Sequence, residues 1–358
     1  MNTFAIHLFI DAWPAGWMKT IMDVKRIPKK AWFTFRDVLS PLALSLRSDR
    51  TAGFAGETLP VELWLANDLD EVPEGCSLAY QVLHGEKVLA SGSAPAMPER
   101  CAPACQGMID VKIPALTERS EITVTATLID LQGTAIHDTR VVFNAFPKAP
   151  RVTAPVFVYG DKARGQAALA ALGIDPAAGP IGEAEVILVT DVEDYLSAPQ
   201  DLNRAVRNGA RAILLSLPTG RHAIGAHAVE VRKAGMGPRH FVSCDSGHPM
   251  IEGFEREDFK FWFDESAGHA TPLLTTVLAA DGWTPILLSG DGGWGRSWGP
   301  VPVATERADG KGCWRLCQVE LLNRLKTNPV AALFAARLLT SKNLPANTGK
   351  FDKIPTAV

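Results

Sequence analysis

The feature of this sequence that most constrains its fold is a change in the spacing of apolar residues near residue 147. From about residue 42 to residue 146, apolar and polar residues alternate with a period of two, which is typical of half-buried β-strands. After the proline-containing segment 147–150, short apolar runs alternate with stretches of helical spacing. The sequence therefore predicts an all-β part followed by a part in which strands and helices alternate.

The all-β part, residues 42–147, is predicted to be an immunoglobulin-like β-sandwich. Val61, Leu63 and Leu65 show the alternation clearly, and His84-Gly85-Glu86 separates two further runs as a short hairpin loop. About seven short strands in roughly a hundred residues fit such a sandwich. The Cys…Trp…Cys pattern of antibody domains does not occur there, so kinship with antibodies is not implied.

The second part, residues 151–342, is predicted to be a doubly wound α/β domain of flavodoxin- or amidotransferase-like outline. Its alternation of strands and helices favours a parallel sheet with helices on both faces. A hairpin is expected across residues 309–312, Asn328 is expected to cap the last helix, and residues 343–358 read as a flexible polar tail. Strands are expected at 156–159, 186–191, 212–217, 241–244 and 285–288, and helices at 164–172, 198–207, 273–279 and 329–339.

The first 41 residues pose a different problem. The apolar run 4–10, bounded by Asp11, predicts a fully buried strand, and residues 29–39 predict an amphipathic helix between Pro28 and Pro41. A buried strand needs partner strands, and such a helix needs a surface to cover. We therefore expect a multidomain protein in which residues 1–41 are the last strand and helix of a domain whose other strands lie outside this sequence. The resemblance described below implies that this domain is a (β/α)8 TIM barrel.

Composition excludes several classes of function. Hydrophobic residues make up 47% and charged residues 21% of the chain, as in ordinary globular proteins. The net charge is -3 with scattered Lys and Arg, so no nucleic-acid partner is expected. No apolar run approaches the roughly 18 residues of a membrane span, and the first residues lack the basic start of a signal peptide. The cellular compartment is left open.

Six cysteines are present, without a Cys-x-x-Cys pair or clustered histidines, so no metal site is expected. Cys313 and Cys317 lie four residues apart in a strand-like run and are expected to be buried thiols. A disulfide between Cys101 and Cys105 is left open.

Residues 290–295 match the G-x-G-x-x-G pattern of dinucleotide-binding loops after a predicted strand. Such a loop must open a helix, and Pro300 and Pro302 forbid one here. We therefore expect no nucleotide and no other cofactor. The stretch is instead predicted to be a glycine-rich surface loop whose Trp294 and Trp298 either stack on sugar rings or pack on a neighbouring domain.

Two further groups of residues could carry chemistry. Cys244, with His248 nearby, could be a nucleophile of the amidotransferase kind, but Asp245 would raise its thiol pKa and Pro249 leaves no helix for a nucleophile elbow. His248 and His269 are expected to be loop histidines. The second group consists of five acidic residues, Glu255, Glu257, Asp258, Asp264 and Glu265. Nothing in their spacing selects two of them as an acid/base pair. A solvated acidic rim around Phe259, Phe261 and Trp262 is favoured instead.

The opening stretch resembles the end of the catalytic barrel in glycoside hydrolase family 2, which includes β-galactosidases, β-glucuronidases and β-mannosidases. The resemblance lies in residues 9–17 and in the stretch from Asp23 to Phe33, in which Asp…Arg-x-Pro-Lys is followed by aromatic residues. Residues 57–68 resemble the start of the sandwich that follows this barrel. Residues 151–340 resemble an amidotransferase-like carboxyl-terminal domain of some members, to which we assign no activity.

This resemblance implies the carboxyl-terminal portion of a retaining β-glycosidase. The family's catalytic carboxylates lie at the ends of the fourth and seventh barrel strands, with Asn-Glu as the acid/base motif. No Asn-Glu dipeptide occurs in this sequence, so no catalytic residue is assigned and the chain alone is expected to be inactive. Trp13 is implied as the sugar-stacking residue, with core packing as the other interpretation. Asp11 and Trp17 are weaker candidates for the substrate rim.

The partners implied are a carbohydrate, namely a β-glycoside, and the missing amino-terminal catalytic barrel. The alternative is a free-standing accessory or carbohydrate-binding protein without catalysis, which would use Trp294, Trp298 and the sandwich. The predicted orphan strand at 4–10 favours the first hypothesis.

Overall fold

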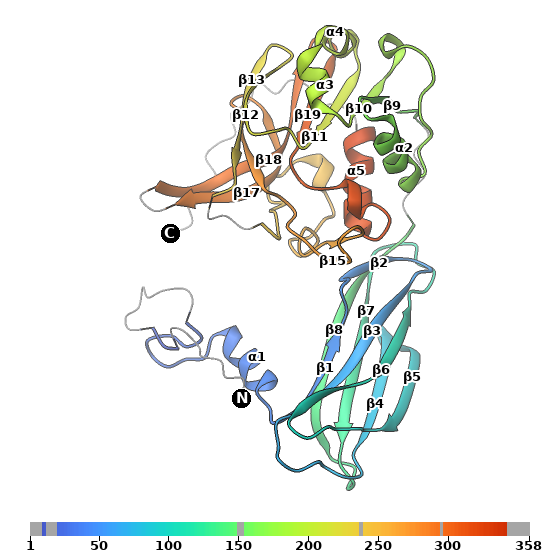
Figure 1. Ribbon diagram of the computed structural model, residues 1–358, viewed down its shortest axis with the longest axis vertical. Coiled ribbons are helices and arrows are strands. Elements are labelled where there is room, and N and C mark those ends of the chain that lie inside the picture. Colours follow the sequence, from blue (N-terminus) through green and yellow to red (C-terminus); the bar gives the residue numbers. More distant parts are fainter. Residues whose placement is uncertain (1–8, 12–19, 149–153, 236–238, 294–295, 342–358) are drawn as a thin grey trace. The chain divides into compact units, whose positions relative to one another are not determined.

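The computed structural model describes residues 9–11, 20–148, 154–235, 239–293 and 296–341. They form two compact units (Figure 1). Unit 1 comprises Met1–Ser48, Gly56–Ile113 and Ser120–Asn144, and unit 2 comprises Asp49–Ala55, Pro114–Arg119 and Ala145–Val358.

Unit 1 is built on antiparallel sheets with a sandwich-like arrangement. One sheet has the order β1-β3-β6, and a five-stranded sheet has the order β2-β8-β7-β4-β5, of which β2 belongs to unit 2. The strands are β1 (Leu42–Arg47), β2 (Ala52–Phe54), β3 (Thr58–Asn67), β4 (Ser77–His84), β5 (Lys87–Pro95), β6 (Ala102–Lys112), β7 (Ser120–Ile129) and β8 (Ala135–Phe146).

Alternation along the strands creates the core of unit 1. Every second residue of β3 from Leu59 to Leu65 is buried, and every second residue of β7 from Ile122 to Leu128 is buried as well. Residues two apart in a strand face the same side, so the period of two places each apolar set on one face of its sheet. The predicted hairpin joins β4 to β5, and its Gly85 adopts a positive φ of 58° that only glycine adopts without strain.

Helix α1 (Lys30–Val38) precedes β1 and confirms the predicted helix, but none of its residues is buried. The prediction of a fully buried strand at 4–10 is wrong for its two described residues, because Phe9 is 43% exposed and Ile10 is 39% exposed. Ile10 forms only an isolated parallel bridge to Met22. Residues 4–8 lie outside the described part.

Unit 2 is organised around a mixed six-stranded sheet in the order β17-β18-β19-β11-β10-β9. The four strands β9, β10, β11 and β19 are parallel to one another, and β18 runs antiparallel to both of its neighbours. These strands are β9 (Phe157–Tyr159), β10 (Val186–Val189), β11 (Arg211–Leu215), β17 (Thr284–Gly293), β18 (Arg296–Asp309) and β19 (Gly312–Cys317).

Helices pack on both faces of this sheet, as the sequence predicts. The buried residues of α2 (Lys162–Ala171) and α5 (Pro329–Thr340) belong to one hydrophobic core, and those of α4 (Gln200–Asn208) belong to the other. The remaining helices are α3 (Val192–Ser197), η1 (Ile181–Glu183), η2 (Pro249–Ile251) and η3 (Leu322–Arg324). No helix in the described part of the chain is long and apolar enough to cross a membrane.

Several local predictions for unit 2 are wrong. The helix expected at 273–279 is instead strand β16 (Thr276–Ala279), which pairs with β13 (His227–Lys233), itself paired with β12 (Gly220–Ile224). The strand expected at 241–244 forms only isolated bridges. Such short apolar runs carry no clear period, so their pairing partners decide their structure. A small sheet joins β14 (Phe263–Asp264) to β15 (His269–Ala270).

The amino-terminal cap of α5 gives a stability test. The Asn328 side chain accepts hydrogen bonds from the N–H groups of Val330 and Ala331, at 3.0 and 3.2 Å. Asn328→Ala should therefore lower the free energy of unfolding by about 1 kcal/mol, measured by urea denaturation. Asn208→Ala, at the exposed end of α4, is the control and should change it by less than about 0.5 kcal/mol. Equal losses in both variants would contradict the cap.

Candidate functional site

A buried polar cluster in unit 1 contains the one described residue of the predicted substrate rim. The Asp11 carboxylate accepts a hydrogen bond from the Thr20 hydroxyl at 2.6 Å. It also forms an ion pair with Lys29, whose Nζ lies 2.7 Å from the second carboxylate oxygen. Lys29 Nζ also lies 2.5 Å from the Thr20 hydroxyl oxygen. Asp11 and Thr20 flank residues 12–19 in the sequence, so this Asp11–Thr20–Lys29 clamp joins the two ends of that stretch.

The turn before Lys29 explains why the Asp…Arg-x-Pro-Lys pattern matters here. The Asp23 carboxylate accepts hydrogen bonds from the N–H groups of Lys25 and Ile27, and Arg26 between them has a positive φ of 62°. The Lys29 N–H then donates to the Ile21 carbonyl oxygen at 3.0 Å. This tight turn brings the chain back on itself and delivers the Lys29 ammonium to Asp11.

The clamp also determines what Asp11 can do chemically. Hydrogen bonds from Lys29 and Thr20 lower the pKa of Asp11, so the group is a carboxylate at neutral pH. Each of its oxygens already accepts a strong hydrogen bond, so the first role of Asp11 is to hold the segment together. Trp13 and Trp17, the other predicted rim residues, lie outside the described residues. Thr20 and Lys29 were not predicted as partners of Asp11, although the Pro28-Lys29 pair in the family-like pattern pointed to Lys29.

The glycine-rich stretch is a strand, and this corrects the predicted surface loop. Gly290 and Asp291 belong to β17 and pair with Pro300 and Gly299 of β18 in an antiparallel hairpin. No helix follows, so the geometry of a dinucleotide site is missing from these strands. Trp294 lies outside the described residues, as does the side chain of Trp298.

Cys244 lacks the surroundings of a nucleophile. The thiol is buried, no strand-to-helix elbow contains it, and burial together with the nearby Asp245 carboxylate raises its pKa. A raised pKa leaves less of the reactive thiolate at neutral pH. The structure therefore agrees with the sequence analysis in disfavouring catalysis here.

His248 lies in a loop just before η2, as expected, and its side chain is buried. Its Nδ1 accepts a hydrogen bond from the Met250 N–H, and its Nε2 lies 3.2 Å from a carboxylate oxygen of Glu306. The other oxygen of Glu306 accepts a hydrogen bond from Arg315 Nε at 3.0 Å. Burial alone would raise the pKa of Glu306, but His248 and Arg315 lower it below its usual value. All three side chains are buried and partner one another, so this group is closed to substrates.

The predicted acidic rim around Phe259, Phe261 and Trp262 is wrong for two of its five carboxylates and for two of its three aromatic residues, since only Phe261, at 53%, is exposed. Phe259 and Trp262 belong to the core, and the side chains of Asp258 and Asp264 are buried. Asp258 accepts a hydrogen bond from Arg119 at 2.7 Å and from the Glu255 N–H at 2.7 Å, yet burial still raises its pKa. The arginine partner lies 139 residues away in the sequence, so local spacing could not reveal the pair.

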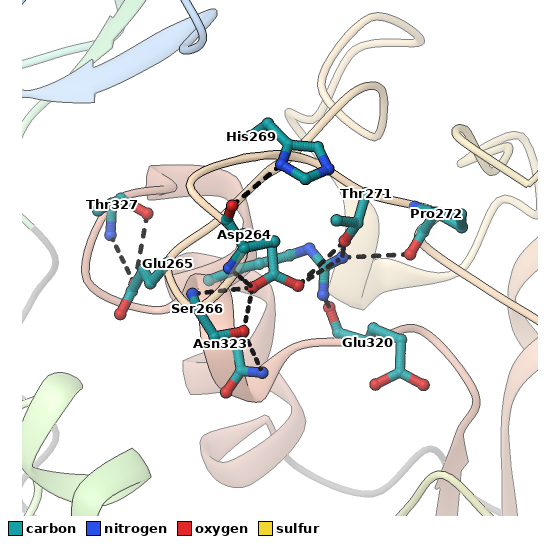
Figure 2. Close-up of polar contacts among 11 residues, drawn as sticks. Asp264, Glu265, Ser266, His269, Thr271, Pro272, Glu320, Asn323 and Thr327 are labelled. Atoms are coloured by element: carbon teal, nitrogen blue, oxygen red, sulfur yellow. Dashed lines mark hydrogen bonds and ion pairs between the residues drawn. The ribbon is translucent and has the colours of Figure 1, made fainter.

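Asp264 lies at the centre of a second network, between residues 264–272 and 320–328 (Figure 2). One of its oxygens accepts from the Ser266 hydroxyl and from the N–H groups of Ser266 and Ala267, and the other accepts from Thr271. Arg324 Nη2 lies 3.5 Å from the second oxygen. Burial would raise the pKa of Asp264, but these hydrogen bonds outweigh burial and lower it. A carboxylate with this many donors holds two loops together and has no capacity left for acid/base work.

Glu265 also holds these two loops together. One of its oxygens accepts hydrogen bonds from the N–H groups of Lys326 and Thr327, which ties the two loops together beside Asp264 (Figure 2). His269 belongs to strand β15, so the expectation of a loop histidine is wrong for it, although its side chain is exposed and lies 3.0 Å from the Ala267 carbonyl oxygen. None of the predicted acidic residues therefore pairs with another as an acid and a base.

The structure also shows where four of the cysteines lie. Cys105 lies in β6 and Cys101 just before that strand, so they are about 13 Å apart along an extended chain, too far for a disulfide. Cys313 and Cys317 are buried in β19, as predicted, and burial raises their pKa values to about 11 and about 12. No group of three or more His, Cys, Asp or Glu side chains within the described residues could hold a metal ion.

Comparisons with known proteins give only distant structural similarity. No protein-family model matches the chain, and no curated protein sequence matches it. A β-glucuronidase of Parabacteroides merdae is 10% identical with a TM-score of 0.22, over 49% of this chain and 25% of that one. A Paenibacillus cycloisomaltooligosaccharide glucanotransferase, complexed with cycloisomaltoheptaose, is 10% identical with a TM-score of 0.24, over 48% of this chain and 27% of that one.

The CARDB domain of a Pyrococcus furiosus protein, in complex with di-metal ions, is 11% identical with a TM-score of 0.22, over 30% of this chain and 86% of that one. The chain thus weakly resembles parts of glycoside hydrolases and glycosyltransferring enzymes and spans about a quarter of the length of the two enzymes. At such low scores the resemblance carries no argument about function.

The Asp11–Thr20–Lys29 clamp predicts a measurable titration. The hydrogen bond from Lys29 is the largest cause of the lowered Asp11 pKa, so Lys29→Met should move that pKa up toward 3.8. NMR titration of the Asp11 carboxyl carbon measures the change. Lys30→Met removes the neighbouring exposed lysine and should leave the Asp11 pKa unchanged. An identical Asp11 pKa in Lys29→Met and in the unchanged protein would show that the pair does not form in solution.

The Asp264 network predicts a pH-dependent loss of stability. Asp264→Asn removes the charge that several donors stabilise, and should lower the free energy of unfolding at pH 7 by about 2 kcal/mol in urea denaturation. Because the folded-state pKa is lowered, this contribution is present above 3.8 and is lost as the pH falls through the lowered value. The control Glu257→Gln removes a surface pair with Lys260 and should cost less than about 1 kcal/mol. A pH-independent difference for Asp264→Asn would contradict this account.

Proposed function

We propose that this chain is the non-catalytic carboxyl-terminal portion of a retaining β-glycosidase of the glycoside hydrolase family 2 type. In this proposal, residues 1–41 complete the catalytic barrel, and the sandwich and the α/β unit support it. The observation that carries the proposal is that the Asp11–Thr20–Lys29 clamp holds the segment resembling the family's barrel end, while six large apolar side chains in the described part of residues 1–41 remain exposed.

The uncovered apolar side chains indicate a missing partner surface. Helix α1 buries no residue, although its sequence is amphipathic. Six large apolar residues of the segment are between 39% and 64% exposed: Phe9, Ile10, Ile27, Phe33, Val38 and Leu39. Exposed apolar residues gathered in one short segment are typical of a contact surface and would be covered by the barrel strands and helices in the proposed enzyme.

The chemistry of the reaction supports a non-catalytic role. A retaining glycosidase needs two carboxyl groups about 5 Å apart, one as acid/base and one as nucleophile. The buried carboxylates Asp258, Asp264 and Glu306 are instead engaged by arginines. The proposal therefore places hydrolysis in the partner barrel. It gives Trp13, at the end of the proposed last strand, the task of stacking on a sugar ring, since barrel active sites lie at the carboxyl ends of the strands.

The first test is a turnover assay on the purified chain. We expect no hydrolysis of aryl β-galactoside, β-glucuronide, β-mannoside or β-glucoside by a sample whose cooperative thermal unfolding shows that it is folded. Turnover that follows the chain through every purification step would overturn the non-catalytic role. Substitutions in the acidic group at 255–265 would then be tested first.

The second test distinguishes a barrel partner from a free-standing protein. A family 2 catalytic barrel, produced without its last strand and helix, should bind the chain in light-scattering measurements. Phe33→Asp should abolish this binding because it places a charge on the exposed apolar side of α1. Thr34→Asp, at the neighbouring exposed position, is the control and should bind normally. Failure of several such barrels to bind would favour the free-standing protein.

A further inference from the structure

The outer face of the larger sheet in unit 1 carries a groove that the proposed function does not use. Two hollows of about 550 and 460 Å³ lie on strands β4, β5, β7 and β8, and both are lined by Thr125 and Thr127. Because both hollows border these two residues, they adjoin each other on the sheet, and together they are called the groove below. Four strands correspond to three inter-strand spacings, or about 14 Å, so the groove is longer than a single sugar ring.

The strand register shows which side chains form the floor of this groove. Gln81 pairs with Ser91 on one side and with Thr125 on the other, and the next row is Ser93, Ala79 and Thr127. Paired residues face the same side of a sheet, and the residues that alternate with Thr125 and Thr127 are buried in the core. The floor therefore consists of five polar side chains and Ala79, all facing away from the core. The ring of Tyr80 lies over Gly92 on the opposite face.

The end of α1 forms one wall of the groove, and His137 holds this wall in place. Its Nδ1 accepts a hydrogen bond from the Leu44 N–H at 3.2 Å, so the proton of the neutral ring resides on Nε2. Nε2 then donates to the Asp37 carbonyl oxygen at 3.3 Å. These two bonds connect β8 to β1 and to the end of α1, where Asp37 and Val38 line the groove.

Apart from His137 and Asp37, eight polar side chains of the groove make no hydrogen bond or ion pair with any described residue, unlike the carboxylates around Asp264. Their donors and acceptors therefore remain available to a ligand. They are Gln81, Ser91, Ser93, Thr125, Thr127, Asp138, Thr139 and Arg140.

The chemistry of this lining selects a class of ligand. Asp138 and Arg140 carry opposite charges in the same groove, and Asp37 forms an ion pair with Arg36 at 3.0 Å, so the charges balance and favour neither anions nor cations. Hydroxyl, amide and carboxylate groups in rows match a ligand that carries many hydroxyls, each both donor and acceptor. We infer that this groove binds a neutral oligosaccharide chain. The choice of a sugar rests on the proposed glycosidase function, whereas the groove itself is independent of that function.

The test is NMR titration of the full chain with β-1,4-linked trisaccharides of glucose, mannose and galactose. Without an aromatic ring for stacking, hydrogen bonds alone predict a Kd on the order of 1 mM, so titration extends to about 20 mM. At least one trisaccharide should shift the amide signals of β4, β5, β7 and β8 in a saturable way. The double variant Thr125→Val and Thr127→Val, which keeps side-chain shape, should weaken binding at least about tenfold.

Thr123→Val is the matched control, because Thr123 lies on the same strand and the same face outside the groove. It should bind as the unchanged chain does. Shifts by none of the trisaccharides, or undiminished binding in the double variant, would overturn the inference. Binding of sulfate but of no sugar would also overturn it and would indicate an anion at Arg140. The turnover assay is separate, so loss of sugar binding leaves the glycosidase proposal standing, and turnover by the chain leaves the groove standing.

Discussion

The architecture of unit 2 depends on one buried strand. All six residues of β19 are buried, and the strand joins the parallel half of the sheet, through β11, to the antiparallel half, through β18. Its first residue must be glycine, because a Cβ on Gly312 would lie 2.1 Å from the Ala210 carbonyl oxygen. Trp314 then fills the core beneath α4, and Cys317 the core beneath α2 and α5. A single strand thus determines how both hydrophobic cores are filled.

The same strand carries a charge into the interior, and the structure shows how that charge is stabilised. Arg315 is fully buried and donates to Glu306, to the Leu338 carbonyl oxygen and to the Ser341 carbonyl oxygen. A guanidinium at the end of α5 compensates the unpaired carbonyls and the negative end of the helix dipole. Buried charges in unit 2 are therefore paired for structural reasons, which makes the unpaired polar groups of the unit 1 groove the better candidates for binding.

The sequence was informative where local chemistry decides the structure. The cap at Asn328, the turn at Gly85 and the alternation in β3 and β7 each depend on residues close together in the chain, and each was predicted. Features that depend on residues far apart in the chain were not predicted. The helix expected at 273–279 became a strand because β13 offers it a partner, and Asp258 is buried because Arg119 reaches it. The candidate site divides in the same way, since Asp11 was named from its position but Thr20 and Lys29, which hold it, were not.

The clamp in unit 1 gives a physical reason for a sequence pattern that is otherwise only a resemblance. Asp23 folds the chain into a turn through two backbone N–H groups, and Pro28 limits the backbone just before Lys29. Together they deliver one ammonium group to Asp11 and Thr20 across 18 residues of sequence. The clamp leaves the described apolar side chains around it, such as Phe9, Ile10 and Ile27, exposed. This is what the proposed function requires, because in that proposal the catalytic barrel supplies the packing surface of residues 1–41.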